Sequence, residues 1–143
     1  VNMVADMWNG MPGMGHSGAA RAGMVNLTKT AAYEWSAHNV RVNAVAPGWI
    51  ASSGMDAYGP GMAPLLRSLK DNNPMKRMGL EAEVSAVICF LLSPGATFVT
   101  GVTVAIDGGA PLNSPIYPIA NHPPAPTFDG FHRAVTPQVL KDL

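Results

Sequence analysis

The chain has 143 residues, of which 48% are hydrophobic and 13% are charged, a composition that indicates a folded core and excludes a disordered chain. Nine Lys and Arg residues balance nine Asp and Glu residues, and no basic run is longer than Lys76-Arg77, so we expect no nucleic-acid partner and no membrane partner. The single cysteine, Cys89, cannot form an intramolecular disulfide, and the apolar run around it predicts a buried structural thiol.

The first residues predict a strand and a loop. Residues 1–5 form a short apolar run typical of a buried strand, and residues 6–15 are rich in Gly and Pro. A buried parallel strand needs neighbours on both sides. We therefore expect the sequence to be a fragment, or a truncated gene product, of a protein that is roughly twice as long.

A helix and a second strand follow. Residues 17–37 contain no proline and predict a helix, whose many Ala and Gly positions allow another helix or the sheet to approach closely. The β-branched run 40–46 predicts a strand, which Pro47-Gly48 ends because proline cannot donate to a ladder. A strand, a helix and a strand form a right-handed βαβ unit, so we expect a parallel sheet.

The remaining elements repeat this alternation. Residues 62–71 predict a short helix, and residues 81–92 predict a longer one that begins with acidic residues and stops before Pro94. Residues 102–106 predict a third buried strand, closed by Asp107-Gly108-Gly109. We expect residues 1–110 to form the folded domain.

The rest of the chain, residues 111–143, is rich in proline and lacks apolar periodicity. It predicts an extended C-terminal arm with one helical turn near residues 138–143.

Several of these pieces together resemble the C-terminal half of the short-chain dehydrogenase/reductase family. They cover residues 1–109 and comprise the helix with HSGAARAG and NLTK, then RVNAVAPGWI, Lys76-Arg77-x-Gly79, Glu83-Val84, FLLSPGATFVTG and VAIDGG. The resemblance implies an α/β fold: the C-terminal half of a Rossmann-like, doubly wound parallel sheet, with about three strands and crossover helices and without its N-terminal half. Within the family, the chain is most similar to the peroxisomal trans-2-enoyl-CoA reductases, which are close to the 2,4-dienoyl-CoA reductases. The segments that carry this likeness are HSGAARAG, NLTK, EW and CFLLSP.

That branch reduces the double bond of an acyl-CoA thioester with NADP(H), so the resemblance implies this oxidoreductase activity, an acyl-CoA substrate and NADP(H), or alternatively NAD(H), as cofactor. It also implies a homo-oligomer, because the helix at 17–37 packs against its symmetry mate in the family. The Gly-rich turn that holds the cofactor pyrophosphate belongs to the absent half, so we expect the fragment alone to be inactive. The sequence contains no uninterrupted apolar stretch of about 18 residues, the length that a membrane-spanning helix needs. We expect a soluble cytoplasmic protein. In a eukaryote we expect a peroxisomal one, although no clear C-terminal signal is present.

The candidate catalytic residues depart from the family pattern of Tyr-x-x-x-Lys. Alignment on Ala22-Gly23 places Ser17 at the tyrosine and Arg21 at the lysine, and Ala5 takes the place of the usual serine. A serine hydroxyl is a far weaker acid than a phenol, and arginine keeps its proton at neutral pH, so carbonyl reduction is disfavoured. Reduction of an enoyl thioester fits better, because Arg21 or Ser17 could support the enolate oxygen while water or His16 protonates Cα.

Each candidate also has a structural alternative. Ser17 is of a type that favours the N-cap, and His16 suits a hydrogen bond at the start of a helix. Arg21 suits an anchor for the cofactor ribose or for the fold. Lys29 ends a run, Val25–Lys29, that mimics the family motif without its tyrosine, and we do not assign catalysis to it.

A second candidate segment follows the strand at 40–46. The segment that lines the nicotinamide in the family is matched here by Pro47, Gly48, Ile50 and Ser52. The resemblance implies that main-chain groups of Ile50 and the Ser52 hydroxyl would meet the carboxamide. The alternative is an ordinary turn after a strand. Large apolar side chains could line an acyl pocket or simply fill the core: Trp8, Trp49, Met55, Met62, Met75 and Met78.

Two other functions stay open at this point. The chain could be a catalytically silent interaction module that keeps the association helix of the family, because Ala5, Ser17 and Arg21 replace the usual residues. It could also belong to a short-chain dehydrogenase that acts on a carbonyl or an alcohol.

Overall fold

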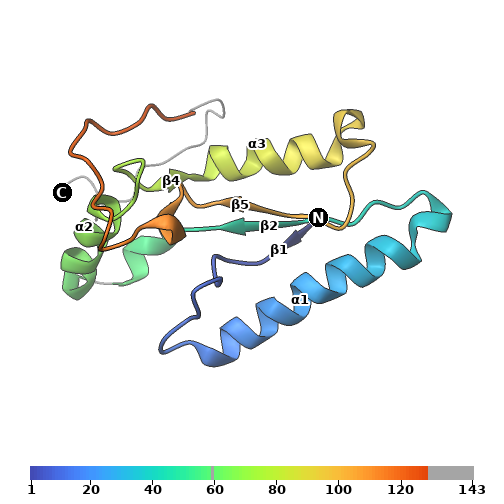
Figure 1. Ribbon diagram of the computed structural model, residues 1–143, viewed down its shortest axis with the longest axis horizontal. Coiled ribbons are helices and arrows are strands. Elements are labelled where there is room, and N and C mark those ends of the chain that lie inside the picture. Colours follow the sequence, from blue (N-terminus) through green and yellow to red (C-terminus); the bar gives the residue numbers. More distant parts are fainter. Residues whose placement is uncertain (59, 129–143) are drawn as a thin grey trace. The chain divides into compact units, whose positions relative to one another are not determined.

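The computed structural model describes residues 1–58 and 60–128, so the helical turn expected at 138–143 lies outside the described residues. The chain divides into two compact units, one made of Val1–Pro47 and Ser85–Ile106, the other of Gly48–Val84 and the residues from Asp107 onward. The α/β class and the parallel sheet expected from the sequence are confirmed (Figure 1). Short 3-10 turns connect the main elements at Ser36–His38, Ser53–Tyr58, Pro60–Met62, Pro94–Ala96 and Ala110–Leu112.

The first unit contains a three-stranded parallel sheet in the order β1-β2-β5. These strands are β1 (Asn2–Met3), β2 (Ala44–Pro47) and β5 (Thr103–Ile106). β2 is central, and its residues Ala44, Val45 and Ala46 are fully buried. Short side chains on a buried central strand let helices pack closely on both faces of a sheet.

Helix α1 (Gly15–Glu34) connects β1 to β2 and contacts one face of this sheet. Met24 and Val25 pack on the cluster of Val4, Ala44 and Ala46, and further along the helix Ala31 and Ala32 pack against Val42. Thr28 lies between these contacts and is also buried: its hydroxyl donates to the Met24 carbonyl (2.8 Å) and accepts from the Asn2 amide (2.9 Å).

The small residues near the start of α1 do not face this sheet. Ala19, Ala22 and Gly23 are exposed, and nothing lies within 4 Å of the position that a Cβ on Gly23 would take. The idea that these positions let the sheet approach closely is therefore wrong for this chain. The sheet side of the helix is set by the larger residues Met24 and Val25, because they bury more apolar area.

Helix α3 (Glu81–Leu92) has the bounds expected from the sequence, but the expected burial of Cys89 is wrong. Cys89 is exposed, as are Phe90 and Leu92, while Leu91 is 2% exposed. A helix that is apolar on every side has no periodicity from which its buried side can be predicted, and this is the physical reason for the error.

The second unit has its own small core around two-residue strands. β3 (Ile50–Ala51) pairs in parallel with β4 (Gly79–Leu80), and helix α2 (Ala63–Asp71) precedes β4. The core consists of Ala51, Met55, Leu66 and Met78. Of the large side chains considered for an acyl pocket, Met55 and Met78 therefore fill the core, whereas Trp8, Trp49 and Met75 are exposed. No helix in the described part of the chain is long and apolar enough to span a membrane.

Candidate active site

Ser17 and Arg21 form a hydrogen-bonded pair in the first turns of α1. They are four residues apart, which places both side chains on one face of the helix. Arg21 Nη1 donates to Ser17 Oγ at 2.5 Å, and the Ser17 main-chain oxygen is 3.5 Å from the same nitrogen. The serine oxygen thus accepts a charge-assisted hydrogen bond, and the hydroxyl proton is directed away from the guanidinium.

The N-cap alternative for Ser17 is not what the structure shows. The helix begins at Gly15 and its N-cap residue is Met14, so Ser17 lies inside the first turn. His16 is exposed in the same turn, and its side chain makes no hydrogen bond to the part of the chain that the structure describes. The structure therefore brings Ser17 and Arg21 together and leaves His16 apart from the pair.

Most of the hydrogen-bonding capacity of Arg21 is unused. A guanidinium has five N–H donors, and within residues 1–58 and 60–128 only Nη1 of Arg21 has partners. Its Nε is buried and has no hydrogen-bond partner in these residues. A half-buried cation with spare donors is suited to an anionic or strongly polar ligand, because ionised groups strengthen hydrogen bonds.

The loop between β1 and α1 folds back on this turn. A Cβ on Gly18 would lie 3.5 Å from Met11 Cβ, in ordinary van der Waals contact. Where the loop leaves β1, the Asp6 amide donates to the Pro47 carbonyl at 3.0 Å, which continues the β1–β2 pairing beyond the strands. The loop therefore lies at the carboxyl ends of β1 and β2, and ligands commonly bind at the carboxyl ends of the strands in open parallel sheets.

Gly48 is more than a turn residue. A Cβ at this position would stand 2.8 Å from Asp107 Cβ and 2.9 Å from Asp107 Cα, closer than real Cβ contacts. The Pro-Gly turn and the Asp-Gly-Gly turn therefore touch through their main chains. This close approach is a packing reason for glycine at position 48, whichever role the turn has.

The segment after Gly48 suits a ligand that binds main-chain groups. In the β3–β4 ladder Gly79 N donates to the Trp49 carbonyl at 3.0 Å, and Ile50 lies opposite Gly79. In this parallel pattern the N–H and C=O of Ile50 point away from β4. The Ser52 hydroxyl makes no hydrogen bond to the described residues. Together with the N–H and C=O of Ile50 it offers donors and acceptors that fit a carboxamide, which has both an NH₂ group and a carbonyl oxygen.

Asn73 is a buried polar residue that the sequence reasoning missed. Its Nδ2 donates to the Asp107 carbonyl at 2.8 Å, and its Oδ1 accepts from the Met75 amide at 2.8 Å. Gly108, which has a φ of +65°, lies against this side chain, because a Cβ there would be 2.6 Å from Asn73 Oδ1. Only the contacts of the folded chain distinguish Asn73 from the exposed Asn72 beside it.

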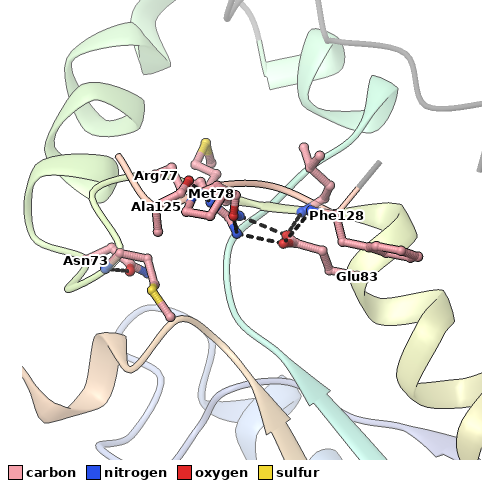
Figure 2. A network of polar contacts seen from close by, with 9 residues as sticks. Asn73, Arg77, Met78, Glu83, Ala125 and Phe128 are labelled. Atoms are coloured by element: carbon pink, nitrogen blue, oxygen red, sulfur yellow. Dashed lines mark hydrogen bonds and ion pairs between the residues drawn. The ribbon is translucent and has the colours of Figure 1, made fainter. Parts of the chain in front are cut away.

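Arg77 and Glu83 form a bidentate ion pair, shown in Figure 2, with Nη2–Oε1 at 2.6 Å and Nη1–Oε2 at 2.8 Å. Burial raises the pKa of Glu83, but the hydrogen bond from Arg77 and those from the amides of Leu80 and Phe128 outweigh it, so the net pKa is lowered. Glu83 is thus held ionised. The resemblance singled out both residues without predicting their contact.

The side chains of Arg41 and Asn43 stabilise the fold by donating to main-chain carbonyls. Arg41 Nη1 donates to the Leu91 carbonyl at 2.8 Å, and Asn43 Nδ2 donates to the Val99 carbonyl at 2.8 Å. These bonds fasten the loop that leads into β5. Just before β2, the Val42 amide bonds to the same loop by donating to Thr100 Oγ1 at 3.0 Å.

Comparisons with known proteins show the family and the fold of the chain. Residues 2–111 match the family model described as Enoyl-(Acyl carrier protein) reductase. The chain belongs to the short-chain dehydrogenase/reductase family. The fold comparison points the same way: a solved structure described as the citronellol catabolism dehydrogenase (AtuB) of Pseudomonas aeruginosa PAO1 is 59% identical, with a TM-score of 0.62, over 76% of this chain and 40% of that one.

Two curated members of the short-chain dehydrogenase/reductase family show how broad the likeness is. A probable 2,4-dienoyl-CoA reductase of Bacillus subtilis is 38% identical over 79% of this chain and 45% of its own length. The 3-oxoacyl-[acyl-carrier-protein] reductase FabG of Staphylococcus epidermidis is 37% identical over 70% of this chain and 40% of its own length. The chain thus spans less than half the length of these relatives.

Proposed function

We propose that the chain is the C-terminal part of an NADP(H)-dependent oxidoreductase that reduces the double bond of an enoyl-CoA thioester. The observation that carries the proposal is the Ser17–Arg21 pair, in which Nη1 lies 2.5 Å from Oγ at the positions of the family's tyrosine and lysine. This pair offers a permanent positive charge and no acidic phenol. Such a site supports a developing oxyanion better than it protonates a carbonyl.

NADP(H), when bound, supplies the hydride that this reaction needs. In the chain itself, Arg21 donates charge-assisted hydrogen bonds to the thioester oxygen as negative charge develops there, and Ser17 orients Arg21 by accepting from Nη1. The proton at Cα comes from water or from His16, which is exposed. The main chain of Ile50 and the Ser52 hydroxyl orient the cofactor carboxamide.

A second candidate is supported by a different observation. The 59% identity to a protein described as a citronellol catabolism dehydrogenase favours an oxidoreductase that acts on an alcohol or a carbonyl. A silent interaction module is the third candidate, favoured by Ala5, Ser17 and Arg21 at the positions of the usual catalytic residues.

Two measurements separate these candidates. Sequencing the gene upstream of Val1 should find a strand, a Gly-rich turn and a helix if the protein is an enzyme, and a start codon directly before Val1 would support the module. The protein with its upstream part is then assayed with crotonyl-CoA and NADPH, and in parallel with citronellol and NAD(P)⁺. We expect turnover of crotonyl-CoA, and turnover of citronellol alone would refute enoyl reduction.

A further inference from the structure

Part of the C-terminal arm is held by hydrogen bonds to the rest of the second unit. Its segment His122–Phe128, here called the arm segment, lies along the loop between α2 and α3 in the second unit. Apart from the His122 side chain, the arm makes these contacts with main-chain atoms. Ala125 N donates to the Met75 carbonyl at 3.0 Å, and the Ala125 carbonyl accepts from Arg77 Nε at 2.9 Å.

Arg77 is fully satisfied by this arrangement (Figure 2). Its five donors find five acceptors: Nε bonds to Ala125 O, Nη1 to Met78 O and Glu83 Oε2, and Nη2 to Glu83 Oε1 and Pro126 O. Two of the five bonds therefore hold the arm segment. A lysine has three donors on one nitrogen and could not reproduce this fork.

Glu83 completes the contact from the other side. Besides Arg77, its carboxylate accepts from the Leu80 amide at 2.8 Å and from the Phe128 amide at 3.4 Å. The arm segment is thus bonded to both members of the ion pair. His122 adds a bond between Nε2 and the Pro74 carbonyl at 2.9 Å.

The same ion pair brackets β4. Arg77 binds the Met78 carbonyl just before Gly79–Leu80, and Glu83 binds the Leu80 amide at its end. β4 has only two residues, and its sole ladder partner in the described chain is β3, Ile50–Ala51. A two-residue parallel pair is too short to hold its own register, so the groups that bracket β4 also hold β3.

We propose that Arg77 and Glu83 are a dock for the arm segment, and that the docked arm keeps Ile50 and Ser52 in place through β4 and β3. In this view Arg77 and Glu83 are positioning residues for the cofactor. That second part rests on the proposed function. The arm segment suits such a dock because its prolines fix φ and lower the entropy that is lost on binding.

The docking itself is tested by hydrogen exchange on the whole chain. Ala125 is the only residue between positions 123 and 126 with a backbone N–H, because the other three are prolines. We expect exchange of this amide to become about tenfold faster or more in Arg77→Ala and in Glu83→Gln, because the arm is released. The exposed Arg67 on α2 is the matched control, and Arg67→Ala should leave the amide protected. An unchanged exchange rate in both dock variants with intact circular dichroism would overturn the dock.

The positioning role is tested by kinetics of the protein with its upstream part. We expect Arg77→Lys and Glu83→Gln to raise the KM for NADPH about threefold to tenfold while kcat changes less than about twofold, the pattern of lost ground-state binding. An unchanged KM in variants whose arm is shown to be released would refute positioning. If the wild type turns over no substrate, the proposed function fails, and the exchange experiment still decides the dock.

Discussion

The main chains of Gly48 and Asp107 approach so closely that a methyl group on residue 48 would lie 2.8 Å from Asp107 Cβ and 2.9 Å from its Cα. The neighbouring atoms belong to the backbone or are attached to it, so they cannot rotate away. We predict that Gly48→Ala destabilises the protein by about 1–3 kcal/mol through overpacking. Thermal unfolding followed by circular dichroism measures the effect. Gly61→Ala is the control, because nothing lies within 4 Å of its Cβ position, and an equal shift in both variants would contradict the prediction.

Asn73 joins two turns of the second unit through both ends of its amide. Replacing it by alanine removes the partner of the Met75 amide and leaves the Asp107 carbonyl with the 3.3 Å bond from the Ala110 amide. We therefore predict that Asn73→Ala lowers the free energy of unfolding by about 1–3 kcal/mol. Chemical denaturation measures this loss. Asn72→Ala, at an exposed neighbour, should change the midpoint little, and a similar loss in both variants would show that the amide bonds of Asn73 contribute nothing specific.

The lowered pKa of Glu83 predicts how the stability depends on pH. Because the pKa in the folded state lies below the ordinary value of 4.5, the ionised carboxylate stabilises the fold at neutral pH. This contribution is fully present above the unfolded pKa and is lost as the pH falls through the folded pKa. We therefore expect the difference in melting temperature between wild type and Glu83→Gln to be constant from neutral pH down to about 5 and to shrink on further acidification. A difference that grows in acid would have the wrong sign.

The sequence predicts the elements better than the contacts between them. Residues 81–92 form the expected helix because its acidic start and the proline after it are local signals. β3 and β4 were missed because two-residue strands are too short to show periodicity and arise from pairing between distant parts of the chain. The hydrogen bond from Asn73 to Asp107 and those from Arg77 to Ala125 and Pro126 likewise join distant parts of the chain. The roles assigned to His16, Ser17 and Arg21 stay predictions.

The Ser17–Arg21 pair predicts unequal effects of two alanine substitutions in the protein with its upstream part. Arg21→Ala removes a charge from the oxyanion site, and we expect kcat for crotonyl-CoA to fall about a hundredfold. Ser17→Ala removes one acceptor that orients the guanidinium, so a loss of about tenfold or less is expected. Arg21→Lys is the control, because lysine keeps the positive charge and lacks the planar guanidinium with its fixed donors. Equal rates for wild type and Arg21→Ala would remove Arg21 from the mechanism.

The last prediction concerns association, for which the first unit offers two surfaces. One is the exposed side of α1, where Gly23 has open space and Leu27 and Tyr33 are 53% and 85% exposed. A symmetric pairing of this helix with its mate buries those side chains, and isologous pairs are the commonest route to homo-oligomers. We expect the protein with its upstream part to form a dimer or tetramer that Gly23→Arg dissociates and that Ala57→Arg, at another exposed position, leaves intact.

The second surface is the free edge of β1. β1 pairs only with β2 in the described sheet, and Met3 on this strand is 62% exposed. Unpaired N–H and C=O groups beside an exposed apolar side chain recruit other chains. The isolated 143-residue chain should therefore form oligomers or aggregates, and Gly23→Arg should not abolish them because the β1 edge is unchanged. Light scattering on both lengths of protein measures this. A monodisperse, cooperatively folding monomer of the short chain would show that residues 1–109 close their own core.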